Sequence, residues 1–564
     1  MSDQIIPPTT AGIDPEKFSP GVYFAKNRSL RIALLIVFLV TGFALRVNHL
    51  GDESFSEDEL NKLQTIQDYR ANGLSGRNGE HPFLMKGLQM VSLIGAEKIN
   101  ASVDSPQLKI SDEAALRFPL VLAGTLSILL IYLLVSELFG GSIGLISAIL
   151  LAVEPMAIGF DRIGKEDSLV LFFFLLTNLF WIRGQTAAET GKSNWLWYAW
   201  AASASFGAVM ASKYYPHMLA VVGGYYVIFQ QVPGQKWALG HSRWPKFFGI
   251  MALTFLVLNP TIVLPDTWRE MFKFSSEGRV VHDSYEYIGH LYRNQASYWL
   301  AGVPWTFYYV FIAVKTSLST LILLLIGLPM MFRRRLGDGR LFIYFWTFFW
   351  FLPFTVLGGK FTRYFALAEP LVLITAAVGF CYLINWITHK MGEKFIAKAA
   401  FQTILLVFVI TWPLYDSIGT SPHFRLFTNA IGASIAPVGS YFPHDEFYDT
   451  STRDIIAEIA GRARYQATVA CETPTLYEYY AQKAGRDDLI FVSLSDVSKV
   501  ASLMPGDLIV AARGRRYLSN SRYLDYLTGS TKPVAETTTG GTPSAEIYEM
   551  DVNSLVGMRS AAAQ

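Results

Sequence analysis

Apolar stretches spread over residues 31–417 constrain this chain more than any other feature of its sequence. A helix that crosses a membrane needs about 20 mostly apolar residues. Eleven stretches qualify, near 31–48, 115–138, 141–158, 168–183, 195–211, 214–230, 246–264, 303–331, 341–357, 364–388 and 399–417. Only 16% of the residues are charged, so the chain cannot cover its surface with polar groups. The sequence therefore predicts a polytopic α-helical membrane protein.

The basic residues between these stretches predict the topology. Lys and Arg gather in the cytoplasmic loops of polytopic proteins. With residues 1–30 as a cytoplasmic segment, the even-numbered connections lie in the cytoplasm. These connections hold Arg183 and Lys192; Lys236, Arg243 and Lys246; Arg333, Arg334, Arg335 and Arg340; and Lys390, Lys394 and Lys398. We therefore expect the other connections to face outward from the cell (inner) membrane, with outer loops at 49–114, 159–167 and 265–302.

Residues 81–99 are also apolar and could be counted as a twelfth span. A twelfth span would place the arginines of 333–340 on the outer side, against the charge rule. We therefore expect this segment to be an amphipathic helix at the outer interface.

The residues after the last apolar stretch have a different character. Strand-like runs alternate with helical ones, and they lie at 466–471, 489–494, 508–512 and 545–550. This alternation is typical of an α/β domain. The predicted organisation is a transmembrane domain at 31–417 followed by a small extracytoplasmic α/β domain at 418–564.

Two charged clusters lie in the predicted outer loops. Residues 56–59 (Ser-Glu-Asp-Glu) follow the first span, and their carboxylates could act as a base on a hydroxyl or bind a metal. The alternative is a solvated polar loop. Residues 161–167 carry five charges between two apolar helices, where desolvation is costly. This second cluster fits an ion-paired structural knot and a functional site equally well.

Several cations lie at the outer ends of the predicted spans or in the outer loops. They are Lys213, Arg293, Lys360 and Arg363, and Lys315 lies inside a span. A cation at this depth needs a partner, and a lipid phosphate is one candidate. The alternative is that these long side chains only extend toward water.

Metal binding is weakly indicated. His282, Glu286 and His290 would share one face of a helix, but the stronger His-Glu-x-x-His pattern is absent. The only cysteines, Cys381 and Cys471, do not suggest a disulfide framework or a zinc site. We expect no metal site, with a divalent metal as the less favoured alternative. The net charge of +2 gives no indication of nucleic-acid binding.

Polar motifs along residues 30–450 resemble the protein O-mannosyltransferases, glycosyltransferase family 39 of the GT-C superfamily. They are Asp58-Glu59, His81-Pro82-Phe83-Leu84-Met85-Lys86, Arg117-Phe118-Pro119, Arg162 to Ser168, Ser212-Lys213-Tyr214, His290-Leu291-Tyr292 and Lys360 to Pro370. Phe83 stands where the family has a second proline. The C-terminal α/β domain replaces the β-trefoil of eukaryotic members, as in many bacterial relatives.

The resemblance implies an inverting glycosyltransferase that uses a polyprenyl-phosphate sugar. The sugar would be a hexose, with mannose slightly favoured. The acceptor would be a hydroxyl of protein Ser or Thr, of a lipid or of a cell-envelope glycan. The implied catalytic residues are Asp58 as the base, Glu59 as the second choice for it, and Asp167. The implied substrate-binding residues are His81, Lys86, Arg162, Glu166, Lys213, His290, Arg293, Lys360 and Arg363.

The main alternative from another class is a lipid or glycan transporter or flippase. Such a protein would carry ionisable residues near the membrane midplane and two matching halves. Here Lys315 alone is deep, and no duplicated halves are evident. A sensor or assembly factor, with the α/β domain as its binding module, is a third possibility.

Overall fold

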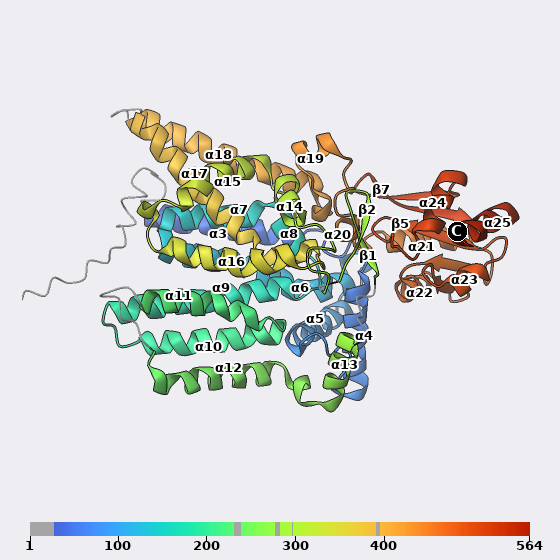
Figure 1. The fold of residues 1–564 in the computed structure, drawn as a ribbon, viewed down its shortest axis with the longest axis horizontal. Helices are drawn as coiled ribbons and strands as arrows, with labels where there is room; N and C mark the ends of the chain where they lie inside the picture. Colours follow the sequence, from blue (N-terminus) through green and yellow to red (C-terminus); the bar gives the residue numbers. More distant parts are fainter. Residues whose placement is uncertain (1–26, 231–238, 277–281, 296, 391–394, 564) are drawn as a thin grey trace, which may run out of the picture.

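Long helices lie side by side in one part of the molecule, and an α/β domain lies beyond one end of them (Figure 1). The computed structural model describes residues 27–230, 239–276, 282–295, 297–390 and 395–563. Lys236, Lys394 and most of the expected cytoplasmic segment at 1–30 lie outside these residues.

Each apolar stretch that the sequence singles out is helical. The helices are α3 (Arg28–Val47), α6 (Asp112–Phe139), α7 (Gly141–Val153), α8 (Pro155–Asp161), α9 (Asp167–Glu189), α10 (Trp195–Ser212), α11 (Leu219–Gln230), α12 (Trp244–Leu258), α14 (Phe307–Lys315), α15 (Leu318–Met331), α16 (Gly339–Val356), α17 (Glu369–Lys390) and α18 (Phe395–Thr420). Among the described residues, 6 helices are long and apolar enough to cross a membrane, or 7 if the bent pair α7–α8 forms one span. The membrane fold class is confirmed, and the count of eleven spans stays a prediction.

One carboxylate, that of Glu154, joins two breaks in the bundle: the break between α7 and α8 and the break between α14 and α15. Helices α7 and α8 meet at 65°, where Pro155 begins α8 immediately after Glu154. Glu154 is fully buried and accepts hydrogen bonds from Ser317 N (2.6 Å) and Thr320 Oγ1 (3.0 Å) at the start of α15. These groups open a helix and have no partner within it, so Glu154 satisfies them.

Small residues allow α15 and α17 to pack closely. Gly327 and Gly379 face one another across these helices. A Cβ at either glycine would overlap the backbone of the opposite helix. Contacts through small residues are the usual way in which membrane helices associate, because lipid offers no hydrophobic drive for it.

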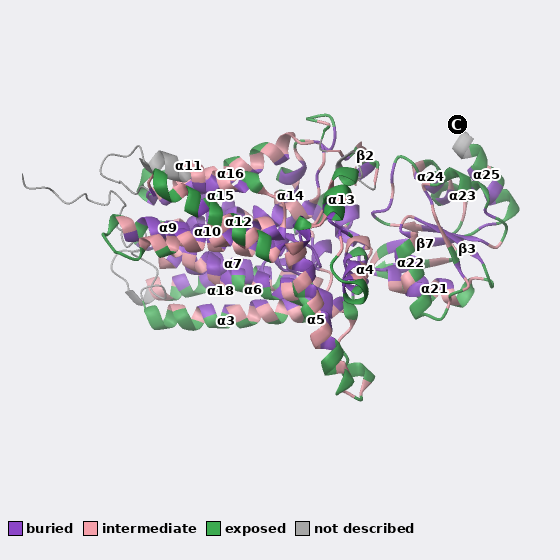
Figure 2. Ribbon diagram, turned by 90° about the horizontal axis from the view of Figure 1, so that it is seen from below, coloured by how far each residue is buried: buried purple, intermediate pink, exposed green. Residues whose placement is uncertain are grey.

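Shorter elements collect at the end of the bundle that faces the α/β domain, called here the domain end. They are α4 (Glu57–Asn72), α5 (Phe83–Ala101), α13 (Pro265–Ser276), β1 (Ser284–Tyr287) and β2 (His290–Arg293). Helix α5 is the helix expected at 81–99, and it runs across the direction of the long helices (Figure 2). It exposes Leu88, Val91 and Ile99, as an interfacial helix would.

The helix considered for His282, Glu286 and His290 does not form. Strands β1 and β2 pair in an antiparallel hairpin with Tyr287 opposite His290. Alternation along a strand replaces the helical spacing, so the three side chains do not share a helix face. Among the described residues, no group of three or more His, Cys, Asp or Glu could hold a metal ion.

The α/β domain is built on a mixed sheet in the order β4-β3-β5-β7-β6. Its strands are β3 (Thr468–Cys471), β4 (Ile490–Ser493), β5 (Leu508–Ala512), β6 (Ala535–Thr539) and β7 (Thr542–Glu549). Its helices are α21 (Thr452–Arg462), α22 (Pro474–Lys483), α23 (Val497–Ala501), α24 (Ser521–Ser530) and α25 (Val552–Ala563). The predicted α/β class is confirmed. Strand β6 was not predicted; a turn through Gly540 and Gly541, both at positive φ, joins it to β7.

The segment between α18 and α21 packs on the helices. It holds α19 (Ala430–Ile435) and α20 (Pro443–Phe447), and the buried Lys315 of α14 fastens it. Lys315 Nζ lies 2.5 Å from Glu446 Oε1 and donates to the carbonyls of Arg425 and Phe427. The deep lysine thus has a protein carboxylate as its partner, and we propose that the α/β domain begins at α21.

Candidate active site

The site is organised by the first turn of α4. Ser56 caps the helix, because its Oγ accepts from Glu59 N (3.3 Å) while Glu59 Oε2 accepts from Ser56 N (2.8 Å). This reciprocal pair is a capping box, and acidic residues in a first turn also meet the positive end of the helix dipole. Glu57, Asp58 and Glu59 follow at steps of about 100°, so their carboxylates point in different directions.

Glu59 is fully occupied by protein partners. Arg117 of α6 binds it in a bidentate way, with Nε 2.7 Å from Oε1 and Nη2 2.9 Å from Oε2. Gly164 N also donates to Oε1 at 2.7 Å. Burial raises the pKa of the Glu59 carboxyl, but Arg117 lowers it below the usual value. Glu59 thus fastens α4 to α6 and to the loop before α9.

Asp58 is the accessible carboxylate of the turn. Its side chain is 38% exposed, whereas that of Glu59 is 1% exposed. Oδ2 accepts from Tyr448 Oη (2.7 Å) and pairs with Lys165 Nζ (2.5 Å), and no described residue donates to Oδ1. Burial raises the pKa of Asp58, but Lys165, Lys62 and Arg363 lower it well below its usual range. Asp58 is therefore ionised at neutral pH with one oxygen free.

Lysines surround this carboxylate on two sides. Lys62 lies one helical turn after Asp58, is buried, and has its Nζ 3.3 Å from Glu166 Oε1. Burial, together with Lys62 and Arg363, lowers the pKa of Lys165 to about 8, although Asp58 opposes this. His81 Nδ1 is 3.4 Å from the same Glu166 oxygen. Burial lowers the pKa of His81 to about 3, so its ring is neutral at pH 7.

Lys213 adds a cation at the end of α10. Its Nζ lies 2.7 Å from Asp167 Oδ1, and it also faces the rings of Tyr215 (4.7 Å) and Tyr364 (4.8 Å). Burial lowers the pKa of Lys213, but Asp167 raises it far above the usual value. Asp167 Oδ2 is buried and has no hydrogen-bond partner among the described residues. Lys213 therefore stays protonated, and its partner Asp167 keeps one oxygen without a hydrogen bond from the described residues.

Arg363 closes the cluster from the connection between α16 and α17. Its guanidinium lies over the ring of Phe361 (4.2 Å) and near that of Tyr448 (5.6 Å), and its Nη1 is 3.4 Å from Asp445 Oδ1. Burial lowers its pKa, but Tyr448, Tyr364 and Asp58 raise it well above the usual range. Arg363 and Lys165 thus act on the same carboxylate.

The backbone at Tyr448, whose hydroxyl donates to Asp58, has an unusual conformation. Tyr448 and Asp449 are consecutive non-glycine residues at φ 46° and 63°. This left-handed region is costly for ordinary side chains and persists where the surroundings hold it. Asp449 stabilises this conformation, because its carboxylate pairs with Arg515 and accepts a hydrogen bond from Glu57 N (3.1 Å).

The structure brings a subset of the predicted site residues into one cluster. These are Asp58, Glu59, His81, Glu166, Asp167, Lys213 and Arg363. Lys62, Lys165, Asp445 and Tyr448 join them. None of the four was among the predicted site residues, although Lys165 belongs to the charged cluster at 161–167. The i, i+4 spacing of Asp58 and Lys62 was an available signal, whereas nothing local to Tyr448 links it to a residue 390 positions away.

Three predicted cations instead donate to backbone carbonyls. Arg162 donates to the carbonyls of Arg46 (2.8 Å), Asn48 (2.6 Å) and His49 (2.9 Å), which closes the end of α3. Lys86 donates to Asn78 O (2.8 Å) and His81 O (3.0 Å), and burial lowers its pKa to about 7. Lys360 donates to the carbonyls of Val303 and Leu357, and burial lowers its pKa to about 8. In this geometry each of these cations shapes a loop.

Two predicted residues lie in the hairpin at the domain end. His290 and Arg293 are both exposed in β2. Arg293 Nη1 donates to Tyr298 Oη at 3.2 Å, and the His290 ring lies near that of Tyr292. Neither makes a described contact with the cluster around Asp58.

Comparison with known proteins shows what part of this chain resembles and which fold it has. Residues 106–263 match the family model described as dolichyl-phosphate-mannose-protein mannosyltransferase. ArnT of Cupriavidus metallidurans, solved with bound undecaprenyl phosphate, superposes with a TM-score of 0.50 at 14% identity, over 92% of this chain and 97% of that one. The protein has a GT-C fold. The GT-C resemblance predicted from the motifs is thereby confirmed.

One curated protein is similar to part of this chain. The putative mannosyltransferase YkcB of Bacillus subtilis is 29% identical over 182 residues, which make up 30% of this chain. The match spans only 23% of the length of YkcB. The oligosaccharyltransferase of Archaeoglobus fulgidus also superposes, with a TM-score of 0.47 at 10% identity, over 86% of this GT-C chain and 69% of that one.

Proposed function

We propose that the protein is an inverting glycosyltransferase that moves a hexose from a polyprenyl-phosphate donor to a hydroxyl acceptor. The observation that carries this proposal is Asp58, an ionised and partly exposed carboxylate between Lys165 and Arg363 at the domain end of a GT-C bundle. A base next to a set of cations is what in-line transfer from a phosphate requires. The undecaprenyl phosphate bound to ArnT supports the donor class, and the mannosyltransferase family match supports mannose as the sugar.

Asp58 acts as the general base in this proposal. Its free Oδ1 accepts the proton of the acceptor hydroxyl while that oxygen attacks the anomeric carbon. The bond from the anomeric carbon to the phosphate oxygen breaks on the opposite side, and the phosphate leaves with both electrons. Lys165, Arg363 and Lys213 stabilise the charge that develops on it. No metal ion is needed for this step.

Donor binding would strengthen the base. The pKa of Asp58 lies well below its usual range because Lys165, Lys62 and Arg363 stabilise its charged form. A phosphate placed among these cations offsets part of their field, which raises the pKa of Asp58. The carboxylate thus becomes a better proton acceptor when the sugar donor is in place.

The remaining site residues position these groups. We assign Glu59 to holding α4, Glu166 to holding Lys62 and His81, and Asp167 to holding Lys213. Arg162, Lys86 and Lys360 keep the neighbouring loops in place. His290 and Arg293, at the rim, remain candidates for contact with the bound substrates.

We also propose that the site faces outward from the inner membrane. The charge distribution of the connections supports a cytoplasmic N-terminus and an extracytoplasmic α/β domain. The deep Lys315 pairs with Glu446. The buried Glu154, which the sequence did not single out as deep, accepts hydrogen bonds from Ser317 and Thr320. These protein partners favour an enzyme over a carrier.

A reconstituted assay tests the proposed function. The purified protein, in proteoliposomes, is incubated with radiolabelled polyprenyl-phosphate mannose and with peptide, lipid and saccharide acceptors. Transfer of label to an acceptor is the expected result. Movement of the labelled lipid across the bilayer, without transfer, would support the flippase instead.

A further inference from the structure

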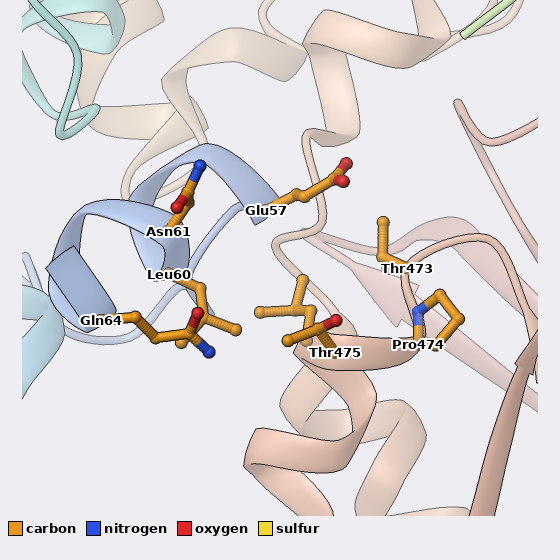
Figure 3. A pocket seen from close by; sticks show the side chains of 8 residues that line it. Glu57, Leu60, Asn61, Gln64, Thr473, Pro474 and Thr475 are labelled. Carbon is orange, nitrogen blue, oxygen red and sulfur yellow. The ribbon is translucent and has the colours of Figure 1, made fainter. Parts of the chain in front are cut away.

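A pocket lies between α4 and the α/β domain, next to the proposed base. It has a volume of about 240 Å³. Helix α4 lines one wall and the start of α22 lines the other, through Glu57, Leu60, Asn61, Gln64, Thr473, Pro474, Thr475 and Leu476. In Figure 3 the side chains of Glu57 and Gln64 extend from α4 toward the start of α22, where Thr473 and Thr475 lie. The residues of α4 have the spacing of a single helix face.

The lining offers hydrogen-bonding groups that the protein leaves unused. Thr473 is only 3% exposed, and its hydroxyl has no hydrogen bond within the described residues. Asn61 and Thr475 are exposed, and their side chains also make no hydrogen bond with the described part of the chain. These groups are free to hydrogen-bond a polar ligand that enters the pocket. Leu60 and Leu476 are buried and supply an apolar wall.

The charge of the pocket favours a neutral ligand. Its lining holds one carboxylate, Glu57, and no cation. Arg515 approaches Glu57 at 3.3 Å but is already paired with Asp449. A phosphate or carboxylate ligand would therefore meet negative charge without a free cation to compensate for it. Amides, hydroxyls and an apolar wall together suit the hydroxyl groups and the CH face of a sugar.

The walls also favour a saccharide over an extended peptide. Peptides commonly bind by adding a strand to an exposed sheet edge. Here the pocket lies between a helix face and a strand-to-helix loop, and β3 already has neighbours on both sides. The volume suits about one sugar unit, because it is slightly below the range of drug-sized pockets.

We propose that this pocket is an acceptor subsite and that the acceptor is a saccharide. The proposal rests on the glycosyltransferase function proposed above. Glu57 lines the pocket and directly precedes Asp58, whose Cα is about 3.8 Å further along the chain. A saccharide anchored on α4 and extending beyond the pocket would bring a neighbouring unit and its hydroxyl to the base.

Binding without the donor tests this proposal separately from catalysis. The full-length protein in nanodiscs is titrated with mannotriose, glucotriose and galactotriose, and with a Ser/Thr-rich peptide. Saturation-transfer NMR reports the binding. We expect at least one trisaccharide to bind. The double variant Asn61→Ala/Thr475→Ala should weaken its binding about tenfold through two lost hydrogen bonds, and Thr475→Trp should block the pocket. Gln67→Ala, an exposed substitution elsewhere on α4, is the matched control and should bind like the unchanged protein.

The outcomes distinguish failure of the proposed acceptor subsite from failure of the proposed transferase function. Absence of trisaccharide binding, binding that the pocket variants leave unchanged, or binding of the peptide alone would each overturn the saccharide subsite. Trisaccharide binding that depends on the pocket supports it. Asp58→Asn should retain this binding, so loss of transfer alone concerns the proposed function and not the subsite.

Discussion

At the scale of single residues, the environment of Asp58 explains why one carboxylate of three can act as a base. Glu59 has its oxygens occupied by Arg117, Ser56 and Gly164, whereas Asp58 keeps one oxygen free. The sequence drew attention to the acidic cluster at 56–59 and to Lys213 because charges beside apolar spans are informative, and the family resemblance suggested Asp58 within that cluster. It could not rank Asp58 against Glu59 by contacts, since those contacts depend on the packing of α4 and α6.

Asp58→Asn tests the base directly. Asparagine keeps the shape of the side chain but cannot accept a proton, so we expect the transfer rate to fall by about 10²–10⁴-fold. The measurement is initial-rate transfer by purified protein, with circular dichroism to show that the helices are retained. Retention of more than about a tenth of the rate would remove Asp58 from the role of base.

Lys165 predicts an alkaline decline in activity. Its pKa is lowered to about 8, so the cation is lost as the pH rises through 8 and donor phosphate binds less well. Because the pH dependence of kcat/KM reports groups of the free enzyme, we expect kcat/KM for the donor to fall above about pH 8.

Lys165→Arg provides the control for this decline. An arginine keeps its charge throughout this pH range, so the decline near pH 8 should disappear in the variant. The same decline in both proteins would assign it to another group.

At the scale of elements, apolar length predicted the helices well and local pattern predicted the small strands less well. The helix considered at His282 to His290 was wrong because strand pairing between β1 and β2 decides that segment. Strand β6 is rich in threonine and lacks a long apolar run, so β7 determines its pairing more than its own sequence does. The breaks at α7–α8 and α14–α15 could not be predicted as a unit, because Glu154 joins elements that are 163 residues apart.

Glu154→Ala tests this junction of broken helices. It leaves Ser317 N and Thr320 Oγ1 without their acceptor in a buried place, which should cost about 1–3 kcal/mol. The measurement is thermal unfolding in detergent. Glu137→Ala is the control, because Glu137 belongs to a partly exposed pair with Arg183 and should cost less than about 1 kcal/mol. Equal effects of the two substitutions would contradict the role of Glu154.

At the scale of the whole molecule, the α/β domain is part of the site and not an independent appendage. Tyr480 Oη donates to Glu113 of the bundle (2.8 Å) and accepts from Phe55 N (2.7 Å) just before α4. Arg515, after β5, pairs with Asp449 beside Tyr448. The sequence predicted two domains but not the interface between them, because these contacts connect positions hundreds of residues apart.

Arg515→Ala should weaken this interface without unfolding the helical bundle or the α/β domain. Loss of the buried pair with Asp449 should lower the local opening free energy of residues 445–453 by about 3 kcal/mol. Hydrogen exchange of that segment and the transfer rate are measured together, and we expect faster exchange with slower transfer. Arg516→Ala is the matched control, since Arg516 pairs with the exposed Asp525. Unchanged hydrogen exchange in Arg515→Ala would show that the left-handed turn at Tyr448 and Asp449 does not depend on the pair between Arg515 and Asp449.

The hydroxyl of Tyr448 on Asp58 also sets an order of events during synthesis. Asp58 lies in the segment that follows α3, whereas its partner Tyr448 is made 390 residues later. A growing chain can insert its helices and meet membrane lipids long before this turn exists. The proposed base therefore lacks this hydroxyl partner until Tyr448 has been translated, and we expect no transfer activity before that point.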